Sequence, residues 1–199
     1  MIFPADLLLA SGSPRRRQLL ASLGWPFRVV VPSVDEAFFP GENPEEGCLR
    51  LSGAKAEAVA CLFPGSWIIA ADTVVLLDGE VLGKPESREE SRSMILRLGG
   101  RTHEVLTGVT LLSPSGKRQE GERTEVTFRP LTPADAARYA ATGEGDDKAG
   151  AYGIQGLGSL LVSSIRGDYF NVVGLPLCRL GQMFESLGCP LSEQWRHEA

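Results

Sequence analysis

The chain has 199 residues, of which 43% are hydrophobic and 23% charged, and its formal net charge is −5. This composition is typical of a soluble globular protein, and the length allows one substantial core or two small lobes that share a sheet. The acidic balance argues against nucleic acid or an anionic membrane surface as a partner, and no apolar run reaches the ~18 residues that a membrane helix needs.

The first predicted element is a short buried strand that leads into an unusual basic turn. Apolar residues 7–10 are followed by Ser11-Gly12-Ser13, and Pro14 then opens a helix with Ser13 as its N-cap. The first turn of this helix holds Arg15, Arg16 and Arg17. Cations at a helix N-terminus face the positive end of the helix dipole, and this interaction is unfavourable unless an anion binds among them. The pattern predicts a phosphate-binding turn, and the alternative is a solvated basic turn.

Strands and helices follow one another without strict βαβ alternation. Helices are predicted at 44–62, 87–98, 132–142 and 175–187, and strands at 27–31, 67–71, 74–77, 81–85, 104–112, 122–128 and 160–165. Asp78-Gly79 marks a hairpin between two of the strands. We expect a mixed α/β or α+β fold built on one mixed sheet, as a single domain over residues 1–190 with a frayed polar tail at 191–199.

Several charged and polar residues are candidates for chemistry. Asp72 follows an apolar run, which predicts a carboxylate at a strand end that can act as a general base or hold a cation. Lys84 lies between a glycine and a proline, and Lys55 lies among apolar residues of a helix. The plainer alternatives are a turn-capping aspartate and solvated lysines. Gln155 either forms hydrogen bonds with the polar edge of a ligand or only with polar groups of its own loop.

Any metal in this protein is expected to be a hard ion on oxygen ligands. The chain has two histidines and four widely spaced cysteines, so a histidine or cysteine metal site is not expected. The cysteine spacing instead indicates reduced thiols in a cytoplasmic protein. Carboxylates that hold a divalent ion, basic groups that neutralise phosphates and one carboxylate that activates water together fit hydrolysis of a nucleotide polyphosphate.

The sequence resembles the Maf-like nucleoside triphosphate pyrophosphatases over about residues 7–187. Four stretches carry the resemblance: LASGSPRR at 9–16, ADTVV at 71–75, GKP at 83–85 and DKAGAYGIQG at 147–156. The resemblance implies a two-lobed fold around a long twisted mixed sheet, similar to that of inosine triphosphate pyrophosphatases, with the site in a central cleft. It also implies cleavage of a nucleoside triphosphate to the monophosphate and pyrophosphate with Mg²⁺ or Mn²⁺, and a homodimer.

The resemblance also implies roles for individual residues. Asp72 would accept the proton, and Glu36 would help Asp72 to hold the metal. The residues expected to bind substrate are Ser11, Ser13, Arg15, Arg16, Lys55 and Lys84, and those tied to specificity are Arg15, Thr73 and Gln155.

The stretch around Gln155 resembles the branch of the family that acts on dTTP and UTP. The Gln155 amide offers a donor and an acceptor for the O4 and N3–H edge of uracil or thymine. Two alternatives stay open. One is a pyrophosphatase with another base preference, such as methylated GTP, and the other is a non-enzymatic regulator of septum formation and cell division.

Overall fold

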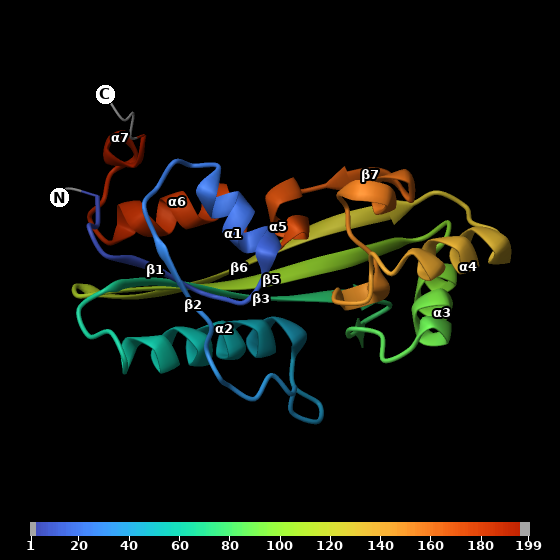
Figure 1. Cartoon of the computed structure of the whole chain (residues 1–199), viewed down its shortest axis with the longest axis horizontal. Coiled ribbons are helices and arrows are strands. Elements are labelled where there is room, and N and C mark those ends of the chain that lie inside the picture. The colour runs from blue at the N-terminus through green and yellow to red at the C-terminus, as the bar shows by residue number, and fades with distance from the viewer. Residues whose placement is uncertain (1–2, 196–199) are drawn as a thin grey trace. The chain divides into compact units, whose positions relative to one another are not determined.

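The computed structural model describes residues 3–195, and residues 1–2 and 196–199 lie outside the described part. The described strands form a seven-stranded mixed sheet in the order β2-β1-β3-β5-β6-β7, with β4 pairing with β3 off this path (Figure 1). They are β1 (Leu7–Ala10), β2 (Arg28–Val30), β3 (Trp67–Leu77), β4 (Glu80–Leu82), β5 (Thr102–Ser113), β6 (Gly116–Phe128) and β7 (Val162–Arg166). β1 is parallel to β2 and β3, whereas β4 is antiparallel to β3 and β7 is antiparallel to β6.

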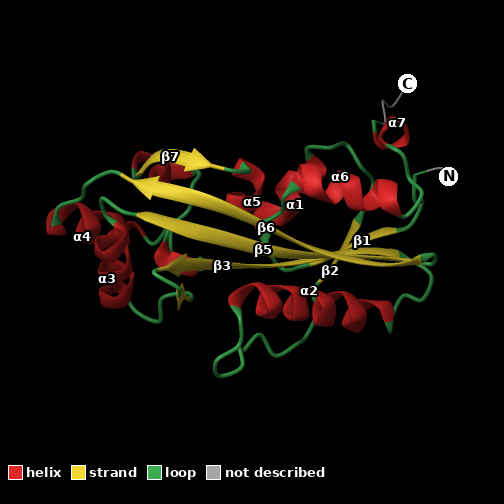
Figure 2. Cartoon of the chain, turned by 180° about the vertical axis from the view of Figure 1, so that it is seen from behind, coloured by secondary structure: helices red, strands yellow, loops and turns green. Residues whose placement is uncertain are grey.

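Helices flank this sheet, which confirms the predicted mixed fold (Figure 2). They are α1 (Pro14–Ala21), α2 (Pro44–Ala60), α3 (Arg88–Leu98), α4 (Pro133–Thr142), α5 (Tyr169–Val173), α6 (Leu177–Ser186) and α7 (Leu191–Gln194), with short 3₁₀ turns η1 (Ala149–Ala151) and η2 (Gly156–Leu160). Within the described part of the chain, no helix is long and apolar enough to cross a bilayer.

The chain divides into two compact units. Among the described residues, unit 1 contains 3–72, 107–122 and 174–195, and unit 2 contains 73–106 and 123–173. Strands β3, β5 and β6 each contribute residues to both units. The single domain over residues 1–190, the two lobes and the cleft between them stay predictions.

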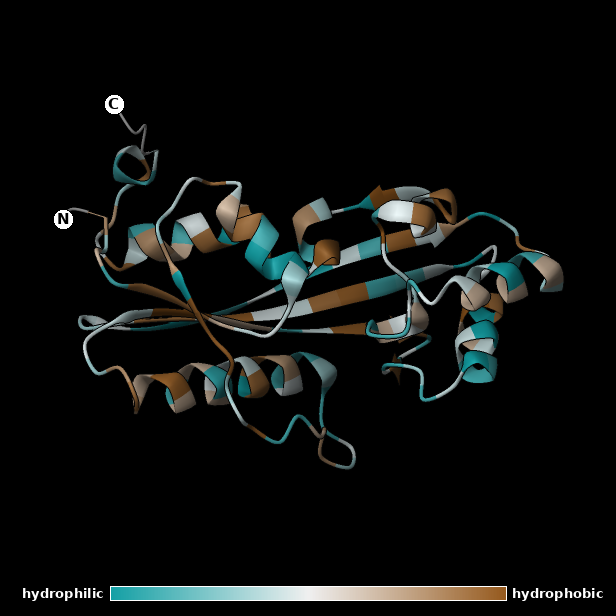
Figure 3. Cartoon of the chain, in the orientation of Figure 1, coloured by the Kyte–Doolittle hydropathy of each residue, from teal (hydrophilic) through white to brown (hydrophobic). Residues whose placement is uncertain are grey.

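In unit 1, helices cover both faces of the short parallel strands. α2 lies along one face, and α1 and α6 lie along the other (Figures 1 and 2). Leu8 and Ile68 belong to the core cluster with Ala56 and Val59 of α2. Burial on both faces explains why β1 is hydrophobic at every position, whereas α2 alternates between hydrophobic and hydrophilic residues (Figure 3).

Aromatic side chains fill the rest of the unit 1 core. Phe184 of α6 stacks on Trp67 of β3, with ring centroids 5.2 Å apart and planes 2° apart. Trp25 meets the same phenylalanine edge-on at 5.1 Å, and Phe3 stacks on it at 5.7 Å. These rings join the strand layer to α6 and hold the segment that leads from α1 to β2.

In unit 2, a smaller aromatic cluster includes a residue of the glycine-rich stretch. His103, Phe128 and Tyr152 meet edge-on with centroids 4.7–5.3 Å apart. His103 Nε2 lies 2.7 Å from the Tyr152 hydroxyl, and both side chains are buried. Helices α3 and α4 pack on each other in the same unit.

Helix starts agree with the sequence where a helix carries its own cap. The Asn43 side chain accepts from the backbone N–H groups of Glu45 and Glu46, and Thr132 forms a capping box with Asp135. The sequence does not predict helix α5, which is only five residues long.

The predicted frayed tail is wrong for its first residues. It begins with helix α7, whose Gln194 is buried and donates to the carbonyl groups of Gly181 and Cys189 at 3.0 Å. These bonds tie the short helix to the end of α6. Residues 196–199 of the predicted tail lie outside the described residues.

Candidate functional site

The turn after β1 brings two serine hydroxyls and Arg16 together. Ser11 is buried, and its Oγ accepts hydrogen bonds from Ser13 N at 3.1 Å and from Arg16 Nη1 at 3.4 Å. Ser13 caps α1, as predicted, by accepting from Arg16 N at 3.4 Å. Arg16 Nε donates to the carbonyl oxygen of Gly174 at 2.8 Å. A contact across 158 residues of sequence therefore holds the Arg16 guanidinium beside the serine turn.

Two positive charges, those of Arg15 and Arg16, lie in the first turn of α1. Burial lowers the pKa of Arg16, while the negative charge of Asp72 acts to raise it and the nearby Arg15 acts to lower it further. A guanidinium stays protonated in proteins, so Arg16 keeps its charge at neutral pH despite its burial. Two half-buried arginines together with the helix dipole fit a polyphosphate chain.

A buried ion cluster lies close enough to Arg16 to influence it. Lys55 Nζ of α2 lies 2.6 Å from Asp72 Oδ1 and 3.1 Å from Glu36 Oε1. The Lys55 and Asp72 side chains are only 6% and 11% exposed, whereas Glu36 is 54% exposed. The cluster thus places one carboxylate in the interior and a second at the surface, both on the same ammonium group.

The position of Asp72 in its strand differs from the sequence prediction. The sequence predicts a strand that ends at Asp72 and Thr73, with extended residues 74–77 after it, but β3 is one continuous strand from Trp67 to Leu77, and Asp72 lies at its centre. The strand continues because the ammonium of Lys55, from α2, satisfies the buried carboxylate there. Sequence reasoning had no means to supply this partner, which is 17 residues away.

Asp72 and Glu36 supply oxygen atoms of the kind that a divalent ion takes as ligands. No group of three or more His, Cys, Asp or Glu side chains suited to a metal occurs among residues 3–195. Mg²⁺ is commonly bound by one or two carboxylates together with substrate phosphates and water, and Asp72 and Glu36 meet on one cation already. Where a metal binds, these two side chains would hold it, and it would supply positive charge to the phosphate chain.

Three of the predicted site residues belong to unit 2. Thr73 follows Asp72 directly and is half-buried, whereas Lys84 and Gln155 are exposed. The backbone N–H of Gly150 donates to the carbonyl of Gly83 at 3.0 Å. This bond ties the GKP stretch to the DKAGAYGIQG stretch, two of the segments that carried the resemblance.

The structure therefore brings most of the predicted residues together in unit 1. Hydrogen bonds, ion pairs or charge interactions link Ser11, Ser13, Arg15, Arg16, Glu36, Lys55 and Asp72. Sequence reasoning missed the carbonyl of Gly174, which holds Arg16. Gly174 lies in the NVVGLP stretch at 171–176, and only the fold shows that its carbonyl group accepts a hydrogen bond from Arg16.

Cys48 lies close enough to Asp72, Arg16 and Lys55 for their charges to act on its thiol, but it is not a candidate for a chemical role. Burial raises the pKa of the Cys48 thiol to about 12, and the negative charge of Asp72 adds to the increase. A thiol with this pKa is protonated at neutral pH and is a poor nucleophile or metal ligand. Cys48 is thus a packing residue of α2.

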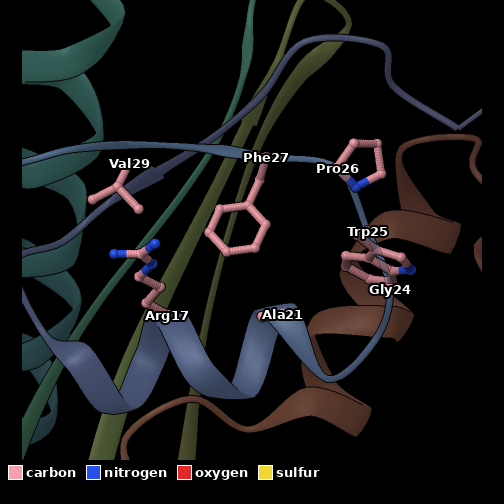
Figure 4. A pocket seen from close by; sticks show the side chains of 7 residues that line it. All are labelled: Arg17, Ala21, Gly24, Trp25, Pro26, Phe27 and Val29. Atoms are coloured by element: carbon pink, nitrogen blue, oxygen red, sulfur yellow. The ribbon is translucent and has the colours of Figure 1, made fainter.

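A separate pocket opens beside α1. Its volume is about 590 Å³, and Figure 4 shows the Arg17 side chain and the Phe27 ring at its walls. It is lined by Arg17, Ala21, Gly24, Trp25, Pro26, Phe27 and Val29. None of the predicted site residues lines it, so this pocket is distinct from the ion cluster.

Comparison with known proteins gives the family. A family model described as Maf-like protein matches residues 6–187. This chain belongs to the Maf-like family. It is 50% identical to a dTTP/UTP pyrophosphatase of Symbiobacterium thermophilum, over 94% of this chain and 96% of that protein. It is 51% identical to one of Halalkalibacterium halodurans over 87% and 91%, and 48% identical to one of Myxococcus xanthus over 96% and 95%.

Solved structures are more distant from this Maf-like chain. The Ham1 protein of Staphylococcus aureus is 17% identical over 77% of each chain, with a TM-score of 0.46. A dITP/XTP pyrophosphatase of Mycobacterium abscessus is 15% identical over 92% of this chain and 98% of that chain, with a TM-score of 0.44. A likeness of this size adds nothing to the site described above.

Proposed function

We propose that this Maf-like protein hydrolyses dTTP and UTP, including modified pyrimidine nucleotides, to the nucleoside monophosphate and pyrophosphate. The observation that carries the proposal is the buried Asp72 carboxylate, held by Lys55 beside Glu36 and within the electrostatic reach of Arg16. A base, a cation and a phosphate cradle are the parts that phosphoanhydride hydrolysis needs. The names of the relatives support the pyrimidine triphosphates as substrates.

In the proposed reaction, the oxygen of water bonds to the α-phosphorus, and the bond from that phosphorus to the oxygen that bridges it to the β-phosphate breaks. Asp72 accepts the proton of the attacking water, and pyrophosphate leaves with the electron pair of the broken bond. Arg15, Arg16 and Lys84 bind phosphate oxygens and offset the charge that develops on the leaving group. Mg²⁺ or Mn²⁺ held by Glu36 and Asp72 would add charge neutralisation when bound.

The proposal extends to the setting of the enzyme. The four cysteines are free, which supports a reducing compartment such as the cytoplasm. The partner is a small nucleotide rather than nucleic acid, in keeping with the net charge of −5. A homodimer is part of the proposal on the basis of the family alone.

The test is pyrophosphate release from dTTP, UTP, CTP, GTP, methylated GTP and ATP, with Mg²⁺ or Mn²⁺. We expect selective release from dTTP and UTP, loss of activity with a chelator, and a fall of at least about 100-fold in Asp72→Asn, the size typical of losing a general base. Asp78→Asn is the matched control, because Asp78 is an exposed turn carboxylate that directly follows the same strand.

Three outcomes would contradict parts of the proposal. Near-normal turnover of folded Asp72→Asn would exclude Asp72 as the base. Activity on methylated GTP, or an unchanged base preference in Gln155→Ala, would overturn the role given to Gln155. No release from any nucleotide by the folded protein would favour the regulator of cell division instead.

A further inference from the structure

We propose that Glu144 and Tyr139 form a clamp that positions Gln155 for recognition of the base. This inference rests on the proposed function, because it takes Gln155 to read the pyrimidine edge. All residues of the clamp belong to unit 2. Neither Glu144 nor Tyr139 would touch the nucleotide in this role, so they are positioning residues that act through Gln155.

The Glu144 carboxylate holds the segment after Gln155. Its Oε2 accepts from the backbone N–H of Leu157 at 2.8 Å, and its Oε1 accepts from the backbone N–H of Gly158 at 2.8 Å. A side chain 13 residues away in sequence thus satisfies two N–H groups at the start of η2. An ionised carboxylate is a strong acceptor for paired backbone donors.

The Tyr139 hydroxyl holds the segment before Gln155. It accepts from the backbone N–H of Gly153 at 3.2 Å and donates to Glu144 Oε1 at 3.0 Å. Gly153 and Leu157 bracket Gln155, two residues away on either side. One connected network therefore fixes both ends of the short segment that carries the exposed glutamine.

The glycines of this segment leave room for the clamp. Gly156 has φ +65°, and a Cβ there would lie 2.6 Å from Glu144 Oε2. A Cβ on Gly158 would lie 2.7 Å from the Tyr139 hydroxyl and 2.0 Å from the carbonyl oxygen of Gly153. The backbone is thus packed directly against the two polar groups, and any larger residue at these positions would displace them.

The charge state of the clamp is suited to this role. Burial acts to raise the pKa of Glu144, but the Leu157 and Gly158 N–H groups and the Tyr139 hydroxyl outweigh it and hold the pKa below its usual value. The Lys148 ammonium donates to the Glu144 carbonyl and, at 2.6 Å, to Asp147 Oδ1. The Glu144 carboxylate therefore stays ionised at neutral pH. The bond from Lys148 also fixes the backbone at Glu144 itself.

Positioning matters here because an exposed glutamine discriminates bases only through the geometry of its amide. Uracil offers an acceptor at O4 and a donor at N3, and cytosine offers the reverse. A mobile glutamine could pair with either edge, whereas one held at a fixed place on the backbone favours the edge for which its surroundings are arranged. The clamp therefore belongs to specificity rather than to bond cleavage.

The experiment compares kcat/KM for UTP and CTP in wild type, Glu144→Gln, Tyr139→Phe, Gln155→Ala and the double variant Glu144→Gln/Gln155→Ala. In Glu144→Gln, one carboxylate oxygen is replaced by an NH₂ group, which cannot accept a hydrogen bond. Either the Leu157 or the Gly158 backbone N–H therefore loses its acceptor. We expect the UTP-to-CTP ratio to fall about five- to tenfold in Glu144→Gln, the factor for about one hydrogen bond. We expect no further fall when Gln155 is already alanine.

Glu125→Gln is the matched control, because Glu125 is also a half-exposed acidic residue of unit 2 and pairs only with Arg166 among the described ion pairs. Backbone amide exchange over residues 153–158 gives a second readout, and we expect it to accelerate in Glu144→Gln but not in the control. Tyr139→Phe keeps the carboxylate and serves where Glu144→Gln folds poorly.

Equal losses for UTP and CTP, or losses that add in the double variant, would overturn the clamp and leave Glu144 a purely structural residue. Unchanged amide exchange in Glu144→Gln would overturn it as well. A wild type without preference for UTP over CTP would overturn the proposed function itself, and that result is distinct because it needs no variant.

Discussion

Lys55 is the residue on which the candidate site depends. Its ammonium is almost fully buried and lies between one interior and one surface carboxylate. Removing two opposite charges from water is costly, and only their mutual attraction and hydrogen bonds offset that cost. The pair stays together because either charge, if buried without its partner, would cost more free energy than the pair does.

Lys55→Met is expected to destabilise the protein by about 3 kcal/mol, the usual size for removing one partner of a buried pair. The methionine fills similar space but leaves the Asp72 carboxylate buried without its cation. Urea unfolding followed by fluorescence measures the change. Lys117→Met is the control, since Lys117 pairs with Glu57 at the surface and such pairs contribute roughly 0–1 kcal/mol.

The double variant Lys55→Met/Asp72→Asn sharpens this test. Because neither charge remains, we expect it to recover part of the stability lost in Lys55→Met, although both site residues are gone. A double variant less stable than Lys55→Met by the full cost of Asp72→Asn would show that the two residues do not interact.

At the scale of elements, α2 approaches β5 more closely than side chains allow. A Cβ on Gly108 of β5 would lie 2.6 Å from the backbone carbon and 2.7 Å from the carbonyl oxygen of Cys48. Backbone atoms cannot turn aside as a side chain can. Gly108 therefore sets the distance between the sheet and the helix that carries Lys55.

Gly108→Ala is expected to push α2 away from the sheet and to cost about 1–3 kcal/mol, as overpacking of a core does. Because Lys55 is on α2, we also expect weaker nucleotide hydrolysis. Thermal unfolding and pyrophosphate release measure the two effects. Gly83→Ala is the control for stability, since a Cβ on Gly83 would meet nothing within 4 Å. Equal melting temperatures for the two variants would contradict the close contact.

At the scale of the whole molecule, one buried histidine links stability to pH. Burial lowers the pKa of His103 to about 4, from 6.5 in an unfolded chain. Between these values the unfolded chain binds a proton that the folded protein excludes. The stability that His103 contributes is therefore present above pH 6.5 and is lost as the pH falls toward 4.

His103→Gln is expected to remove this dependence while an amide can still contact the Tyr152 hydroxyl. Between pH 7 and 4.5, wild type should lose about 2 kcal/mol more free energy of unfolding than the variant does. Urea unfolding at both pH values measures the difference, and the carboxylates titrate alike in the two proteins. The same loss in both would mean that His103 is protonated in the folded protein.

The local elements and the chemical class were predictable from the sequence because their signals are local. Asn43, Ser87 and Thr132 each cap the helix that follows them, and hydrophobic runs mark the strands. The serine and arginine turn at 11–16 has its whole pattern within a few residues, so the family resemblance and the candidate phosphate-binding residues could be read from it.

The tertiary structure alone decided what depends on contacts distant in sequence. It joined the strand on both sides of Asp72, because the ammonium of Lys55 satisfies that carboxylate, and it gave Arg16 its partner at Gly174. It also brought Glu144 against the backbone beyond Gln155. Composition and spacing define which groups a chain possesses, but burial and long-range packing determine which of them meet, since a buried polar group must find its partner wherever the fold places one.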